Sequence, residues 1–527
     1  MSNQLSLRNP SSWLVLGCIT LLQAINGARY SIFSECSTTT ISEKQHCHFS
    51  YMQLNNLMVS SEIGKLFGVL SGIAADYLPA SIILIVGLIF GLVGYGVQYL
   101  YIAHKISSLS YSQILLLNAL AGHSTCWVGT YCYVLAMRNF NASHGTMIAI
   151  TSSYSAFSGK ICSILVDSIQ GKEASQTSLT SLFFMWLAPT AIGLTVATID
   201  FGLKYTQYEG NKEMSAISFL LAISSGVYIV IESVIPKFTH IYPRFRAVVL
   251  LFVLMLPFVI ALIVTLHPIK KSSPQVMPEM SNDYFESTTK KLAVREREIE
   301  EKVNEVLMER NDCGWKDLLI NTNFWLFYLV NSFGAVLAIV YMINLRRISE
   351  SFSSNQTLFL LEVSSTFGFF GRIFTVLFEW HTRKSSIISY PTLTVLLMLP
   401  MPIAIFLLLS NSIRCFYIST VVIGTCSGAL SAITSSTMYG LFGDKNFVAK
   451  QTIFLTSIPL GLLLFGFLAS LNYQREGKEN HGSCFGMLCY SRIFIIWGFI
   501  SIIGILLSFI LHLRVHNLYL HRSLLRI

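Results

Sequence analysis

Long apolar stretches dominate the chain and follow one another at short intervals. Each of fourteen stretches is long enough for an α-helix to cross the hydrocarbon core of a bilayer. The pattern therefore predicts an all-α integral membrane protein with about 14 spans. The predicted spans are 12–34, 51–75, 80–103, 112–137, 143–169, 180–203, 215–238, 245–266, 318–344, 354–379, 386–409, 412–440, 449–472 and 490–513.

The spacing of these spans divides the chain into blocks. Charged residues replace apolar ones over 268–317, which is the longest polar segment in the sequence. We therefore expect an N-terminal six-helix bundle over 1–205 and two additional membrane helices over 206–267. The charged loop of 268–317 then leads to a C-terminal six-helix bundle over 318–514 and a tail over 515–527.

Composition excludes an ordinary soluble enzyme. Of 527 residues, 53% are apolar and 12% are charged, whereas soluble proteins carry roughly 25% charged residues. The net charge of +9 is interpreted first as loop asymmetry, so no nucleic-acid partner is expected. With an even number of spans both termini share one side. Twenty of the 36 basic residues fall on that side and twelve on the other, which predicts that both termini are cytoplasmic.

The charged loop contains a stretch, 290–311, in which acidic and basic residues alternate at helical spacing. Such a pattern is typical of a solvated helix, and it also suits a helix that docks a partner or regulates the protein. The sequence leaves both interpretations open. Either way, the segment is expected to lie in the cytoplasm.

Eleven cysteines are scattered along the chain, and no pair of C-x-x-C motifs offers a metal site. No metal or other cofactor is therefore expected. Cys36 and Cys47 fall in the first outer loop, and Cys484 and Cys489 fall in the last one. If that side is oxidising, each pair can form a local disulfide, which spacing alone does not decide.

Apart from those within two positions of a span end, four basic residues fall inside predicted spans, where a charge costs at least about 2.5 to 3.5 kcal/mol and needs a partner or a function. Lys65 follows Glu62 by three positions on one helical face. The two form a self-neutralising pair, or Lys65 faces a central cavity and binds an anion or couples to a proton. Lys160 has no acid within one turn, so a cavity role and a pairing across helices are both open. Arg29 lies near the outer end of its span, where its side chain can snorkel or join the cavity.

Other polar groups complete the predicted cavity. Glu232 has no local partner and is expected to face another helix, and Glu362 is a candidate for proton coupling because burial favours the neutral acid. The uncharged candidates are Gln23, Asn26, Asn118, His123 and Tyr154. His123 serves either as a hydrogen-bonded packing residue or as a proton relay. Gly64, Gly68 and Gly72 recur every fourth position, which suits either sliding or static helix contact.

Two blocks of six spans around a central loop resemble the arrangement of major facilitator transporters. Gly72-Ile-Ala-Ala-Asp76 resembles a reduced form of that superfamily's loop motif, with Tyr77-Leu-Pro-Ala80 in place of its basic cluster. A closer resemblance, over nearly the whole chain, is to the plant nodulin-like family, which includes proteins named for a nuclear-fusion-defective phenotype. The stretches that carry it are Trp13 to Tyr30, Gly64-Lys65-x-Phe67-Gly68 to Pro79, Gly87 to Tyr95, Ile458-Pro459-Leu460-Gly461 and Cys484-x-Gly486-x-x-Cys489-Tyr490.

The resemblance implies a major facilitator fold with two extra helices, and it implies no particular substrate. Distant similarity to monocarboxylate and oxalate/formate carriers points to a small organic anion. By the same resemblance, Gly72 and Asp76 in the first half and Gly371, Arg372 and Glu379 in the second half are gating or structural candidates. The sequence after Arg372 departs from the family's Gly-rich pattern.

Three classes of function compete. An enzyme is disfavoured, because the chain has no Gly-rich phosphate loop, His/Cys metal cluster or H-E-x-x-H pair. A membrane sensor, receptor or scaffold derived from a carrier fold remains an alternative. The sequence favours a monomeric secondary transporter in a lipid bilayer that uses alternating access, with proton coupling and an unknown small-molecule solute. The organelle is not encoded in these patterns.

Overall fold

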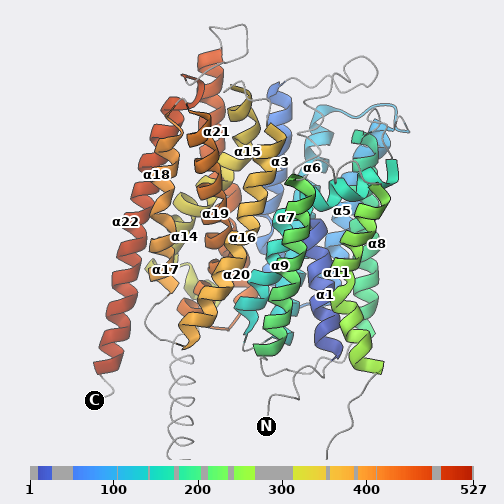
Figure 1. The fold of residues 1–527 in the computed structure, drawn as a ribbon, viewed down its shortest axis with the longest axis horizontal. Helices are drawn as coiled ribbons and strands as arrows, with labels where there is room; N and C mark the ends of the chain where they lie inside the picture. Colours follow the sequence, from blue (N-terminus) through green and yellow to red (C-terminus); the bar gives the residue numbers. More distant parts are fainter. Residues whose placement is uncertain are drawn as a thin grey trace, which may run out of the picture.

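The computed structural model describes residues 10–26, 51–103, 105–140, 143–170, 177–202, 212–234, 243–266, 313–351, 357–384, 390–410, 412–477 and 488–524. Within these ranges every regular element is a helix, and a helix or a pair of consecutive helices lies at each predicted span (Figure 1). The all-α prediction is confirmed.

Eight rods make up the N-terminal part of the described chain. They are α1 (Pro10–Asn26), α3 (Tyr51–Leu66) continued by α4 (Val69–Ala74), α5 (Ala80–Ile102), α6 (Tyr111–Asn139), α7 (His144–Gln170), α8 (Thr177–Gly202), α9 (Lys212–Val234) and α11 (Pro243–Leu266). The last two are the additional helices.

Six rods follow the charged loop, after a short helix α13 (Trp315–Leu318). They are α14 (Thr322–Asn331) continued through a π-helical turn η6 (Ser332–Val336) into α15 (Leu337–Ser351), α16 (Thr357–Lys384), α17 (Tyr390–Met398) with α18 (Pro400–Leu407), α19 (Ile413–Phe442), α20 (Phe447–Leu455) with α21 (Ser457–Gly477), and α22 (Leu488–Leu524).

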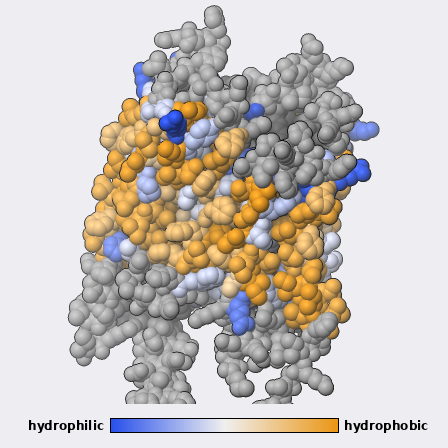
Figure 2. Space-filling view, viewed as in Figure 1, coloured by the Kyte–Doolittle hydropathy of each residue, from blue (hydrophilic) through white to orange (hydrophobic). Residues whose placement is uncertain are grey.

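Lipid dictates both the helical fold and the character of the outer surface. In a bilayer each backbone polar group must be satisfied within the protein, which helices achieve by themselves. By length and composition alone, ten of the described helical segments are long and apolar enough to cross a membrane. Apolar side chains form a belt across the face shown in Figure 2, with polar residues towards its edges. The chain is therefore an integral multi-pass membrane protein.

The rods form two halves. In the first, α6 packs against α3 and α5, and α5 packs against α8. In the second, α16 packs against α19, and α22 packs against α14, α17, α18 and α21. The additional helices cover one flank: α11 contacts α1 and α7, and α9 contacts α7 and α16 (Figure 1).

The two halves meet along what we call the seam. On one line of the seam α7 packs against α16 and α19, and on the other α3 and α4 pack against α21 and α20 respectively. Both chain ends lie on the lower side of Figure 1, which we call the terminal side, and the opposite side is the distal side. Because the rods alternate in direction, α7 begins on the terminal side and α16 begins on the distal side.

Several expectations have a partial outcome. Helix α22 continues to Leu524, so the predicted tail of 515–527 begins as part of that helix. Arg29, Cys36, Cys47 and Cys484 lie outside the described residues, as do the side chain of Cys489 and most of the charged loop. The disulfide predictions and the placement of Arg29 therefore stay predictions.

Candidate functional site

Lys160 stands at the centre of a group of ion pairs on the distal half of the seam. Its Nζ lies 2.5 Å from Glu362 Oε1 of α16 and 3.1 Å from Glu232 Oε2 of α9. Glu232 also pairs with Arg246 of α11. These four residues, which we call the distal ion-pair chain, join four helices and cross from the first half to the second. Of the two interpretations of Lys160, the geometry shows the pairing across helices.

Burial differs along the distal ion-pair chain. The Glu232 side chain is fully buried and that of Arg246 is 8% exposed, whereas Lys160 and Glu362 are 20% and 30% exposed. Asp167, two turns beyond Lys160 on α7, lies within electrostatic range of both Lys160 and Arg246. Glu232 is thus held between two cations in the interior, while Glu362 lies at the more accessible end.

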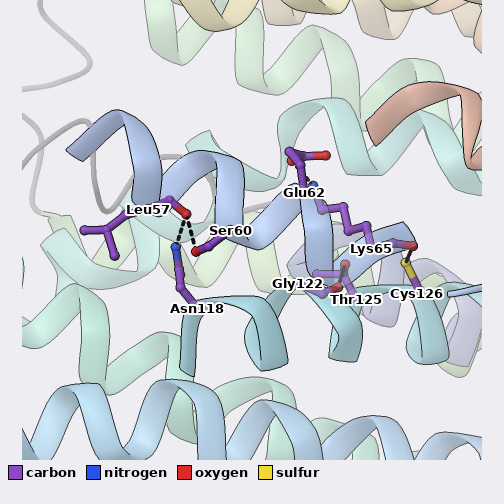
Figure 3. Close-up of polar contacts among 8 residues, drawn as sticks. All are labelled: Leu57, Ser60, Glu62, Lys65, Asn118, Gly122, Thr125 and Cys126. Atoms are coloured by element: carbon purple, nitrogen blue, oxygen red, sulfur yellow. Dashed lines mark hydrogen bonds and ion pairs between the residues drawn. The ribbon is translucent and has the colours of Figure 1, made fainter. Parts of the chain in front are cut away.

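Lys65 forms its ion pair within one helix. Its Nζ lies 2.5 Å from Glu62 Oε1, one turn earlier on α3. Figure 3 shows this pair on the side of α3 away from α6, while Asn118 of α6 donates to the Leu57 carbonyl. Cys126 Sγ lies 3.5 Å from the Lys65 carbonyl oxygen. Here the self-neutralising pair is the arrangement that the structure shows.

Arg372 lies midway along α16 with part of its guanidinium unsatisfied. Its buried Nη1 has no hydrogen-bond partner among the described residues, and Tyr133 of α6 is close enough to interact with its charge. Tyr133 also lies beside Ser435 of α19 and Gln451 of α20. Gln451 is fully buried, yet neither of its amide atoms makes a well-aligned hydrogen bond within the described chain.

We call Arg372, Tyr133, Ser435 and Gln451 the central cluster. It draws one residue from the first half and three from the second, so it lies at the seam. Buried polar groups are normally satisfied, and those that are not require an explanation such as a ligand. A guanidinium with a buried nitrogen and neighbouring hydroxyl and amide groups is suited to an anion with several acceptor atoms.

On the terminal side the halves are joined by hydrogen bonds to carboxylates. Thr146 of α7 donates to Glu379 Oε2 at 2.5 Å across the seam, and Ser436 of α19 donates to Oε1 of the same buried group. Asn446 Nδ2 donates to Asp76 Oδ2 at 2.8 Å, also across the seam. Partial burial raises the pKa of Asp76 above its ordinary value, although Asn446 and Lys450 act in the opposite direction.

Two glycines among the gating candidates have different surroundings. A Cβ at Gly72 would overlap Thr452 of α20, so this glycine permits close approach of the two halves. A Cβ at Gly371 would overlap the Thr425 carbonyl of α19, inside the second half. Gly72, Asp76 and Glu379 therefore lie in the terminal contact between halves, whereas Gly371 supports one half internally.

The remaining candidates lie mostly inside the first half. Asn26 Nδ2 donates to the Thr125 carbonyl at 3.1 Å, and half-buried Gln23 precedes it by nearly one turn of α1. His123 Nε2 accepts from Trp127 at 2.9 Å, as a packing residue would. Tyr154 lies near the seam, where its hydroxyl is 3.1 Å from Ser225 Oγ of α9.

Sequence reasoning missed three buried polar residues. Arg246 lies at the edge of a predicted span, so the pattern assigns it to the flanking segment, but the residue is only 7% exposed. Gln451 is an amide in an apolar run, and that contrast could have marked it. Lys450, at the span edge, is fully buried, and its Nζ binds the carbonyls of Phe442 at 2.7 Å and Gly443 at 2.9 Å.

Two helical halves that meet at a seam are the architecture of the major facilitator fold. The chain superimposes with a TM-score of 0.51 and 11% identity on the xylose transporter XylE from E. coli, in a partially occluded inward-open conformation, covering 95% of this chain and 98% of that one. A D-xylose–proton symporter gives a TM-score of 0.53 with 12% identity, covering 94% and 96%. At these identities the likeness shows the fold alone.

The sequence comparisons identify the family. The Nodulin-like family model matches residues 12–262, and the model of the NFD4 C-terminal domain matches residues 307–521. The chain is 29% identical over 532 aligned positions to the protein NUCLEAR FUSION DEFECTIVE 4 of Arabidopsis thaliana, covering 97% of this chain and 90% of that protein. The N-terminal half of the chain thus matches the Nodulin-like family and the C-terminal half matches the NFD4 C-terminal domain, so the expected resemblance to the nodulin-like family is confirmed.

Proposed function

We propose that the protein is a proton-coupled secondary transporter that moves a small organic anion by alternating access. The observation that carries this proposal is the seam itself. Its distal half is closed by the Lys160–Glu362 pair and its terminal half by hydrogen bonds to Glu379 and Asp76. These contacts are polar, so they can break and re-form as one half rocks against the other.

The proposed solute follows from the central cluster. Lys65 and Lys160 already face carboxylates, so they supply little free positive charge for a solute. Arg372 retains an unsatisfied guanidinium nitrogen, and it lies between the distal contact at Glu362 and the terminal contact at Glu379 on the same helix. The planar guanidinium group fits a carboxylate, which can accept two parallel hydrogen bonds, better than it fits a hydroxyl group. Tyr133 and Gln451 offer further donors beside it, so we assign the solute's acidic group to Arg372.

Proton coupling has its best candidate in Glu362. It is the most exposed member of the distal ion-pair chain. When the distal side opens, Glu362 separates from Lys160, and protonation removes the charge that would otherwise be unpaired. We further propose that the terminal side is cytoplasmic, in line with the excess of basic residues on that side.

The test is uptake into proteoliposomes that contain the purified protein. The panel holds labelled monocarboxylates, dicarboxylates, amino acids, sugars and metal chelates, each with and without an inward proton gradient. The matched control is Arg414→Gln, which removes an exposed arginine at the distal end of α19. We expect gradient-stimulated uptake of a carboxylate by the wild type and by the control, and at least about tenfold less by Arg372→Gln. Selective uptake of a sugar, or full activity of Arg372→Gln, would refute the assignment.

A ligand sensor without flux is the second candidate. It is favoured by α9, which packs against both α7 of the first half and α16 of the second and so can restrict their relative movement. In that case a carboxylate would raise the melting temperature of the wild type but not of Arg372→Gln, and no solute of the panel would be accumulated. The two measurements together separate transport from sensing.

A further inference from the structure

Helix α9 makes contacts of different kinds with the two halves. Towards the first half it is held by polar groups, the Lys160–Glu232 pair and the Tyr154–Ser225 contact. Towards α16 of the second half, the contacts of Phe219 and Gly226 are apolar. The Phe219 and Trp380 rings lie 5.1 Å apart, and Gly226 lies directly against the Phe369 ring.

Helix α11 ties the same unit to the first half. Arg246 pairs with Glu232, and the Tyr228 hydroxyl of α9 donates to the Arg246 carbonyl at 2.8 Å. Helix α11 also packs along α1 and α7 of the first half. Smooth apolar contacts can slide, whereas buried ion pairs resist separation. The additional helices are therefore built to move as one body with the first half.

The charges around Lys160 divide in the same way. The first half and the additional helices contribute Lys160, Asp167, Glu232 and Arg246, whose formal charges cancel. Glu362 is the second half's contribution to the distal ion-pair chain. On the other helices that pack against α16, the charged residues towards the same side include Arg346, Arg347 and Glu350 of α15 and Arg414 of α19. The group of four stays neutral when Glu362 leaves.

From this arrangement we infer that Glu232 is the resident counterion of Lys160 and that Glu362 is its exchangeable one. The inference rests on the alternating access proposed above and adds a role for the two additional helices, α9 and α11. Opening of the distal side takes Lys160 from two carboxylates to one, and α9 and α11 travel with the first half while α16 slides past. Without Glu232, the same movement would leave an uncompensated ammonium group in the membrane, which is costly.

Distances between spin labels on the full-length protein in lipid nanodiscs test which half the additional helices follow. One pair joins Leu220 of α9 to Leu194 of α8, and the other joins Leu220 to Phe374 of α16; all three residues are exposed at the lipid-facing surface. Between pH 8 and pH 5 we expect the α9–α16 distance distribution to shift while the α9–α8 distribution stays constant. A shift of the α9–α8 pair with a constant α9–α16 pair, or no shift in either, would overturn the inference.

Two neutralising variants test the roles of the carboxylates in opposite directions. Glu362→Gln should give the shifted α9–α16 distribution already at pH 8. Glu232→Gln should hold the unshifted distribution at both pH values, because Lys160 then depends on Glu362. Equal effects of the two variants would contradict the assignment. If Glu232→Gln does not fold, Glu232→Gln combined with Arg246→Gln retains the charge balance and tests the same step.

The readout separates this inference from the proposed function. The distances require no solute, so the predicted shifts in a protein that accumulates nothing would leave the inference standing and remove the transport proposal. Carboxylate uptake by a protein in which α9 follows α16 would support the transport proposal and overturn the inference.

Discussion

Lys65 and Lys160 are both lysines within membrane spans, and the structure gives them different surroundings. Lys65 pairs with Glu62 on its own helix. Lys160 pairs with carboxylates on two other helices, one of them in the opposite half of the protein. The first pair accompanies its helix wherever that helix goes. The second depends on how the halves are arranged.

The difference teaches that a buried charge reports on conformation only when its partner belongs to another moving body. A pair within one helix neutralises charge at every stage of a transport cycle. A pair across the seam stabilises the arrangement of the halves in which it forms and is absent from the other arrangement. Substitutions at the two lysines should therefore differ in kind as well as in size.

The largest effect is expected from exchanging the charges of each pair. Glu62→Lys combined with Lys65→Glu keeps the pair on one helix, so the uptake rate should stay within about twofold of wild type and the melting temperature should change little. Lys160→Glu combined with Glu362→Lys restores the contact across the seam but places a carboxylate opposite Glu232. Repulsion in a low-dielectric site should reduce folded yield and uptake to background. Equal tolerance of both exchanges would break the comparison.

Removal of each lysine should give a smaller but still unequal effect. Lys160→Met leaves two carboxylates near each other, and breaking a buried pair costs about 3 kcal/mol, roughly a hundredfold in an equilibrium. Lys65→Met removes one partner of Glu62, whose side chain is only 7% exposed, so the melting temperature should fall by a similar amount, but the pair lies within one helix and the uptake rate of the folded protein should change by no more than about twofold. Melting temperature and initial uptake rate measure both. A greater loss of uptake for Lys65→Met would reverse the argument.

Two glycines extend the comparison from charge to shape. Gly72→Ala inserts a methyl group between the halves, and overpacking there should disfavour the closed terminal side by about 1 kcal/mol or more, changing uptake roughly tenfold. Gly371→Ala inserts the same group inside the second half, where it should lower the melting temperature instead. If Gly72→Ala lowers only the melting temperature, the terminal contact is not a moving one.

The smallest effect is expected at Asp76. Because its pKa is raised in the closed terminal contact, closure binds a proton more tightly than the open arrangement does. Closure should therefore be favoured below the ordinary aspartate range and lose this contribution as the pH rises through the raised pKa. A spin-label pair at Tyr77 and Lys445 should show a modest shift of about twofold in population, absent in Asp76→Asn. A pH dependence that persists in Asp76→Asn would assign it to another group.

Much of the fold could be predicted from the sequence, because the bilayer imposes a length and a composition on every span. Each predicted span coincides with one or more described helices, and most of the described helix ends lie within a few residues of the predicted ones. The Glu62–Lys65 contact was also within reach, since residues three apart share a helix face. The long α22 was not, because its C-terminal turns are polar and extend beyond the apolar run.

The arrangement of the site could be predicted only in part. Lys160 and Glu362 are 202 residues apart in the chain, so their contact depends on how α7 and α16 pack against each other, which one sequence does not state. Arg372 was identified as a gating candidate from its position. Its unsatisfied nitrogen beside Tyr133 and Gln451 results from the approach of three further helices and leaves no mark in the local pattern.

The pairing of Glu232 with Arg246 also bears on how the chain enters the membrane. The two residues lie 14 positions apart on consecutive helices, so they can meet as soon as both helices have left the ribosome. An adjacent helical hairpin whose acid and base neutralise each other presents the insertion machinery with a unit free of net charge at that depth. The Glu232–Arg246 pair can therefore form before the second half, which is synthesised later and supplies Glu362.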